Sequence, residues 1–224
     1  MTVHRETLRN SFPGPRLAGL AMILAPLFLI VGATLAIPFE TGDDATRQQA
    51  LADDPVRGDV VLNGLFGGAI LVSVCIVAMA RLIATKKPLL AAIGGALALA
   101  GTYVSAMFGG VMMYEIALAA EPNREVALAV LARGEPPIVA LLALPGMILG
   151  WLVLGFGAWR AGVFGPLRSI ALAGPALLPF AVLATPALLP VPYTLLAIAL
   201  VPLGVHLLAR RTPARTGQRD KASA

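Results

Sequence analysis

Five stretches without a formal charge alternate along the chain with short segments that hold the charged residues. The stretches cover residues 17–39, 60–80, 88–114, 136–159 and 169–209, and they contain 23, 21, 27, 24 and 41 residues. A helix rises 1.5 Å per residue, so about 20 apolar residues cross a hydrocarbon core of roughly 30 Å. Each of the first four stretches therefore predicts one membrane-spanning helix.

The last stretch is about twice as long as one span requires and predicts two spans folded back to back. Its hinge is expected in the segment LPVPYT, where Pro190 and Pro192 disfavour a continuous helix. The two spans are then 169–189 and 193–209. The predicted fold is all-α, a polytopic bundle of six transmembrane helices over residues 17–209.

The basic residues predict the orientation of this bundle. With a cytoplasmic N-terminus, 13 of the 17 Lys and Arg residues fall in inner segments, and only Arg47, Arg57, Arg124 and Arg133 fall outside. Short cytoplasmic loops carry such an excess of positive charge. We therefore expect both termini in the cytoplasm, as a segment 1–16 and a basic, disordered tail 210–224. Ten of the 12 acidic residues lie in or beside the outer loops, which makes the outer face acidic.

Composition narrows the class of protein. The chain has 224 residues, 58% hydrophobic and 13% charged, with a mean hydropathy of +0.84, whereas soluble domains have about 25% charged residues. We predict a multi-pass protein of the plasma membrane, and its predicted partner is the lipid bilayer that surrounds it. The net charge of +5 does not indicate nucleic-acid binding, because the basic residues lie at the ends of apolar runs. The first run has 23 residues, longer than the about 7 to 15 of a signal peptide, and predicts a retained helix.

Few side chains within the spans have reactive or metal-binding groups. The single cysteine, Cys75, lies inside an apolar run and predicts a buried structural thiol. A membrane haem with two axial histidines requires both inside the bundle, but the only histidines are His4, in the N-terminal segment, and His206. We expect no catalytic residue, no cofactor and no metal site, and we do not expect an enzyme.

Small residues predict close helix packing. The segment GMILG at 146–150 is a GxxxG pattern, which lets two helix backbones approach closely. The pattern suits packing within one chain as well as a homo-oligomer or a membrane-protein partner. The spans are also interrupted by prolines, namely Pro26, Pro145, Pro175, Pro179, Pro186 and Pro202. Neighbouring groups must bind the carbonyls that these prolines leave free.

Two outer segments predict short helices. TGDDATRQQALADDP offers Thr41 or Asp43 as an N-cap and Pro55 as a stop, and NREVALAVLARG runs from Asn123 to Gly134. The second, with Val126, Val130 and Leu131 on one side, suits a position on the bilayer surface. The alternative is that these segments act as lids over an opening.

The segment GGVMMYEIALAAEPNRE places a carboxylate after a long apolar run. Glu115 lies 27 residues beyond Pro88, or about 40 Å along a straight helix, which puts it past the outer edge of a roughly 30 Å core. Asn63, Asp59 and Glu40 are expected at a comparable level. These four residues form either a small acidic vestibule at an outer mouth or ordinary solvated helix ends.

Several runs carry a resemblance. RLAGLAMILAPLFLIVGATLAIP, ALADDPVRGD, VVLNGLFGGAILVSVCIVAMARLI and GGALALAG resemble six-helix integral membrane proteins of high-GC Gram-positive bacteria that are grouped as domains of unknown function. The resemblance covers most of the chain and implies a bacterial cell-membrane protein with this fold. It transfers no functional residue.

Two hypotheses of function follow. The first is a non-enzymatic subunit that acts through its helix faces or acidic outer loops, because the spans are almost free of ionisable groups. The second is a small-molecule transporter or permease whose path opens at Glu115 and Asn63, because prolines and glycines interrupt the spans. Intramembrane charge, the usual mark of an ion route, is nearly missing.

Overall fold

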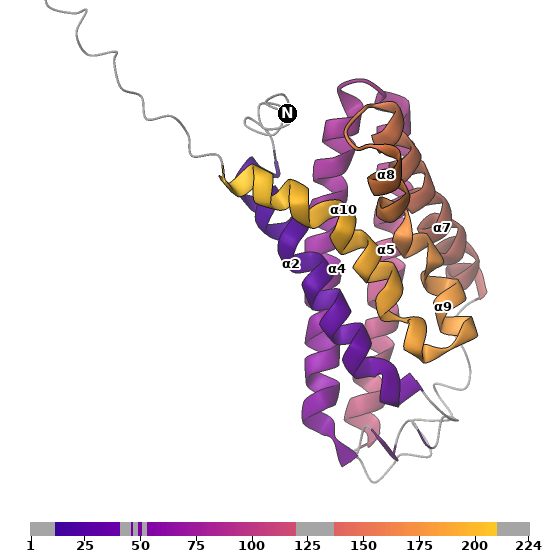
Figure 1. Ribbon diagram of the computed structural model, residues 1–224. Coiled ribbons are helices and arrows are strands. Elements are labelled where there is room, and N and C mark those ends of the chain that lie inside the picture. The colour runs from indigo at the N-terminus through magenta and orange to yellow at the C-terminus, as the bar shows by residue number, and fades with distance from the viewer. Residues whose placement is uncertain (1–11, 41–45, 47–48, 51–52, 120–136, 210–224) are drawn as a thin grey trace, which may run out of the picture.

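The computed structural model is a bundle of helices (Figure 1). It describes residues 12–40, 46, 49–50, 53–119 and 137–209, with the backbone alone at Glu40 and along 105–119, 137–143 and 182–183. Every regular element within these residues is helical, as the sequence predicts. The elements are α2 (Pro15–Ala36), η1 (Ile37–Glu40), α4 (Pro55–Ala84), α5 (Pro88–Ala119), α7 (Pro137–Arg160), α8 (Pro166–Leu172), η2 (Gly174–Leu177), α9 (Leu178–Ala184), η3 (Pro186–Leu188) and α10 (Pro190–Ala209).

Proline begins each of the helices α2, α4, α5, α7, α8 and α10. The first backbone N–H groups of a helix have no partner inside it, so proline loses nothing there and its fixed φ suits the first turn. Pro55 is predicted as the stop of a loop helix, but it is the first residue of α4, and the Asp54 carboxylate caps the helix by accepting from the backbone N–H of Arg57 at 3.1 Å. The second span thus begins five residues earlier than predicted.

The two predicted loop helices fall largely outside the described residues. In the first, Thr46, Gln49, Ala50 and Asp53 are helical, and the Gln49 amide donates to the Asp53 carboxylate at 2.8 Å. The second, from Asn123 to Gly134, lies wholly outside them, as do the N-terminal residues 1–11 and the tail 210–224.

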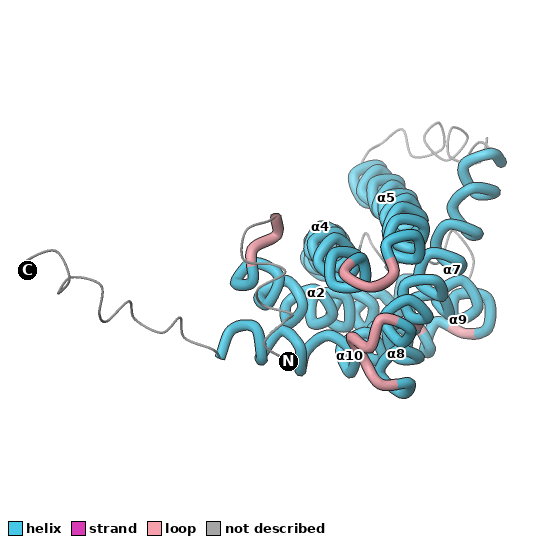
Figure 2. Tube along the Cα trace, turned by 90° about the horizontal axis from the view of Figure 1, so that it is seen from above, coloured by secondary structure: helices cyan, strands magenta, loops and turns pink. Residues whose placement is uncertain are grey.

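The helices pack in the order α10, α2, α4, α5, α7, and α8 with η2 packs between α7 and α10. Figure 2 shows this arrangement from above, with the first and last long helices as neighbours. In Figure 1, α2 and α10 run side by side and are inclined to α4, α5 and α7.

The predicted fifth span is discontinuous. Two seven-residue α-helices, α8 and α9, are separated by the 3₁₀ turn η2, and η3 follows. The elements η2, α9 and η3 each have a proline at the start: Pro175, Pro179 and Pro186. A proline has no N–H to continue the preceding helix, and its fixed φ suits the first turn of the next one. The hinge predicted at Pro190 and Pro192 is misplaced: the chain turns at Thr185, which is extended (φ −167°, ψ 139°), and α10 already begins at Pro190.

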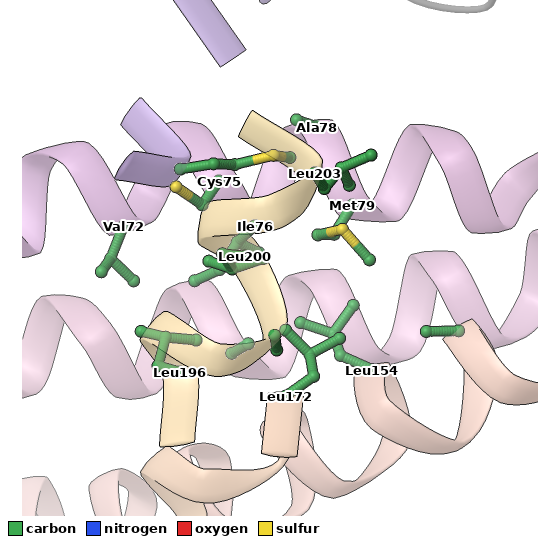
Figure 3. Close-up of a cluster of buried hydrophobic side chains, with 14 of the residues drawn as sticks. Val72, Cys75, Ile76, Ala78, Met79, Leu154, Leu172, Leu196, Leu200 and Leu203 are labelled. Atoms are coloured by element: carbon green, nitrogen blue, oxygen red, sulfur yellow. The ribbon is translucent and has the colours of Figure 1, made fainter. Parts of the chain in front are cut away.

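One apolar cluster fills the centre of the bundle. Figure 3 shows Cys75, Ile76 and Met79 of α4 beside Leu200 and Leu203 of α10. Leu154 of α7 and Leu172 of α8 join the same cluster. Small residues let these helices approach, so aliphatic side chains from four elements meet without a polar layer between them.

The closest helix contact is between α5 and α7. A Cβ added at Gly150 would lie 2.2 Å from the backbone nitrogen of Ala98, and one added at Gly101 would lie 2.5 Å from the Cα of Met147. Gly146 lies against the same turns of α5, with the Leu97 carbonyl 3.4 Å from its added Cβ. The GxxxG pattern therefore packs within the chain, which was one of the two alternatives left by the sequence.

Three of the helical segments are long and apolar enough to cross a membrane. They are Pro15–Phe39, Pro55–Ala84 and Pro186–Ala209. Shorter apolar helical segments among the described residues are Pro88–Val104 and Leu144–Arg160. An all-helical membrane protein is thus supported by length and composition.

Candidate functional site

Two of the four predicted outer residues lie one turn apart on α4. Asp59 and Asn63 are both exposed, and the Asn63 amide donates to the backbone carbonyl of Asp59 at 2.7 Å. This hydrogen bond stays within one helix. It leaves the Asn63 carbonyl oxygen and the Asp59 carboxylate facing outward.

The other two predicted residues belong to the same end of the bundle. Glu40 is the last residue of η1 and follows Phe39, which packs against Val61 of α4. Glu115 lies 27 residues after the start of α5. α4 is the antiparallel neighbour of α5, and Arg57 lies 27 residues before its end, so Glu115 and Arg57 are at the same height along the bundle. The side chains of Glu40 and Glu115 are outside the described atoms. The structure therefore places all four positions at one end without deciding whether they line a vestibule.

Arg57 is a described cation at this acidic end. Its Nε donates to the carbonyl of Leu35 at 3.1 Å, and its guanidinium lies 5.7 Å from the centre of the Phe39 ring. Leu35 is in the last turn of α2, where carbonyls lack partners inside the helix and positive charge is favourable. The sequence predicts Arg57 only as a basic residue on the outer side. The structure shows that its side chain joins the end of α2 to the first turn of α4.

A second arginine repeats this arrangement at the opposite end. Arg168 of α8 donates through Nη2 to the carbonyl of Ala199 in α10, and its guanidinium carbon lies 4.3 Å from the centre of the Phe164 ring. Ala199 precedes Pro202 by three residues, just as Leu35 precedes Pro38. Pro202 disturbs the helical turn before it, and the Ala199 carbonyl in that turn accepts from Arg168.

Three buried polar atoms have no hydrogen-bond partner among the described residues. They are Nε of Arg168, Oγ of Ser169 and Nε2 of His206. Buried polar groups are usually paired, so these atoms mark where α8 and α10 hold unused hydrogen-bonding capacity. Two of the three belong to adjacent residues of α8.

The described charges separate between the two ends. The end where η1 finishes and α4 begins holds the described acids Glu40, Asp53, Asp54, Asp59 and Glu115, together with Arg57. The end with the short connections after α4 and α7 holds the other described bases, Arg16, Arg81, Lys86, Lys87, Arg160 and Arg168 (Figure 1). Lys86 reaches the second of these connections, where its Nζ would lie 3.7 Å from a Cβ at Gly162. One end can therefore bind anions and the other cations.

The described residues offer little else for chemistry. No group of three His, Cys, Asp or Glu side chains within them could hold a metal ion. Cys75 is a free thiol, 1% exposed, in the central cluster. The buried hydroxyl of Thr102 donates to the Ala98 carbonyl of its own helix at 2.8 Å.

Comparison of the chain with protein-family models, with curated proteins and with solved structures finds no match.

Proposed function

We propose that the chain is an integral plasma-membrane protein of six membrane-crossing segments with both termini in the cytoplasm. The segments are α2, α4, α5, α7, the discontinuous α8–α9 unit and α10. The separation of described acids and bases between the two ends supports this orientation, because cytoplasmic loops are rich in Lys and Arg. Membership of the six-helix bacterial family that the chain resembles is part of the same proposal.

The function proposed is that of a non-enzymatic subunit that binds a membrane-protein partner at its acidic outer end. α4 has 30 residues and α5 has 32, so they are about 45 and 48 Å long and exceed a roughly 30 Å core by about 15 Å. The first turns of α4 expose Val56 (72%) and Val60 (44%) beside Asp59. This projecting apolar and acidic surface is the observation that carries the proposal, because interface cores are apolar with polar rims.

Site-specific photocrosslinking in native membranes tests this surface. A photoreactive residue at Val56 is expected to give one dominant protein adduct, and the same residue at Ile70 gives none. Ile70 is the matched control because it is on the same helix and 57% exposed, but lies at mid-membrane depth. Absence of an adduct at Val56, together with unchanged envelope properties after gene deletion, would remove the support for a partner-binding role.

A permease is the second candidate, and the discontinuous fifth segment favours it. Broken helices occur near the binding sites of transporters, and irregular backbone at membrane depth is tolerated where protein or a water-filled cavity surrounds it. Flux in proteoliposomes should then fall when Pro175 and Pro179 are both replaced by alanine. Equal flux in wild type and Glu115→Gln would exclude that carboxylate from the path.

A further inference from the structure

Arg168 is a fixed cation with unused hydrogen-bonding capacity. Nη2 is bound to the Ala199 carbonyl and the guanidinium stacks on Phe164, so the group is held between α8 and α10. Its Nε is buried and has no partner among the described residues. A guanidinium presents donors in a planar fork that matches the oxygens of phosphate or carboxylate.

The surroundings of Arg168 supply no described counter-charge. The five described acids lie at the other end of the bundle, and the remaining acids expected on the cytoplasmic side, Glu6 and Asp220, are outside the described residues. Charged neighbours at this end of the described chain are bases. Leaving a partly buried cation unpaired is costly, so an anion bound here would be stabilised.

The exposed apolar side chains of the two helices that hold Arg168 indicate which anion. On α8, Leu167 and Ile170 are 82% and 70% exposed, and on α10, Ile198 is 55% exposed. A free phosphate would leave this surface in water, whereas a phospholipid covers it with acyl chains while its headgroup reaches the guanidinium. Basic pockets between membrane helices on the cytoplasmic side bind lipid headgroups in this way.

We propose that the seam between α8 and α10 binds an anionic phospholipid, with its phosphate oxygens on the Arg168 guanidinium and its acyl chains along Leu167, Ile170 and Ile198. The choice of the cytoplasmic leaflet rests on the proposed topology. The binding itself does not, because it is measured in detergent without a membrane orientation.

Lipid titration of the detergent-purified protein tests the site. Phosphatidylglycerol and phosphatidylcholine of equal chain length are added separately, and bound lipid is counted by native mass spectrometry. We expect phosphatidylglycerol to bind at least about tenfold tighter, and Arg168→Gln to lose most of this preference, as expected for a hydrogen bond to a charged group. Arg160→Gln is the matched control, because Arg160 is an exposed arginine at the same end, and it should keep the preference.

Three outcomes would overturn the proposal. If the wild type binds the two lipids equally, the anionic headgroup is not what the site recognises. This measurement uses the wild type alone and does not depend on whether a variant folds. An equal loss in Arg168→Gln and Arg160→Gln shows general electrostatic attraction instead of a site. Displacement of phosphatidylglycerol by an equal concentration of inorganic phosphate assigns the site to a free anion. If Arg168→Gln does not fold, Arg168→Lys keeps the charge, loses the planar fork and should bind with intermediate preference.

Discussion

Gly150→Ala should separate α5 from α7. The added methyl carbon would lie 2.2 Å from the backbone nitrogen of Ala98 and 2.6 Å from its Cα, whereas carbon atoms in contact prefer about 3.5 to 4.0 Å. These neighbours are backbone atoms of a helix and cannot rotate away. The two helices must therefore move apart by about 1 Å, a gap that forfeits roughly a quarter to a half of each van der Waals contact across the interface.

The expected cost follows from two opposed effects. Overpacking of this kind destabilises by about 1 to 3 kcal/mol, and the neighbouring close contacts of Gly101 and Gly146 are loosened with it. Alanine in place of glycine favours a helix by about 1 kcal/mol. We expect a net loss of about 1 kcal/mol in the free energy of unfolding. Gly67→Ala is the control, because its methyl would meet only Phe28 at 3.8 Å, and it should gain up to about 1 kcal/mol.

Unfolding by sodium dodecyl sulfate in mixed micelles measures both variants. The fluorescence signal is that of Trp151, which is 3% exposed and adjacent to Gly150, measured with the second tryptophan, Trp159, replaced by phenylalanine in every variant. A Gly150→Ala protein that unfolds at the same detergent fraction as Gly67→Ala would refute the close contact between these helices. An unchanged Trp151 emission spectrum in folded Gly150→Ala would argue against the separation even if stability falls.

Three further predictions use the same unfolding assay. Arg57→Ala should lose about 1 to 2 kcal/mol through the lost hydrogen bond to Leu35, and Arg57→Lys should recover less than half, so full recovery would mean that charge alone matters. Cys75 should react with a maleimide only as the protein unfolds, because its thiol is buried; reaction at the native rate of a free thiol would contradict the central cluster. Asn63→Ala should change stability by less than about 0.5 kcal/mol, as exposed positions do, and a loss well above this would show that Asn63 has a partner beyond its own helix.

The apolar runs predict helices well where packing and propensity agree. α4 and α5 each contain the whole predicted run, and α2 together with η1 contains the first one, because about 20 apolar residues without a charge have few alternatives to a helix in lipid. The ends are less predictable, since proline both stops one helix and starts the next. Pro55 and Pro190 are each read as the end of an element, and each begins a helix.

The candidate site was only partly accessible to sequence reasoning. Counting along helices predicts that Glu115, Asn63, Asp59 and Glu40 share one end, and whether they form a vestibule stays a prediction. It does not find Arg168, because the binding of its guanidinium to Ala199 joins residues 31 apart in the chain. One signal was present in the sequence: Arg168 directly precedes the run that contains Pro175, Pro179 and Pro202. Prolines leave backbone carbonyls without a helical partner, and a neighbouring cation can bind such a carbonyl.

The pairing of α2 with α10 has a consequence for biosynthesis. Gly19 and Gly204 lie so close that a Cβ on Gly204 would be 2.7 Å from the Gly19 carbonyl, yet the end of α2 and the start of α10 are 154 residues apart (190 − 36). At 5 to 20 residues per second, the ribosome needs roughly 8 to 30 s to make the intervening chain. During this interval, the face of α2 that carries Gly19 has no α10 to pack against. A nascent chain stalled before α10 presents that face to the insertion and quality-control machinery.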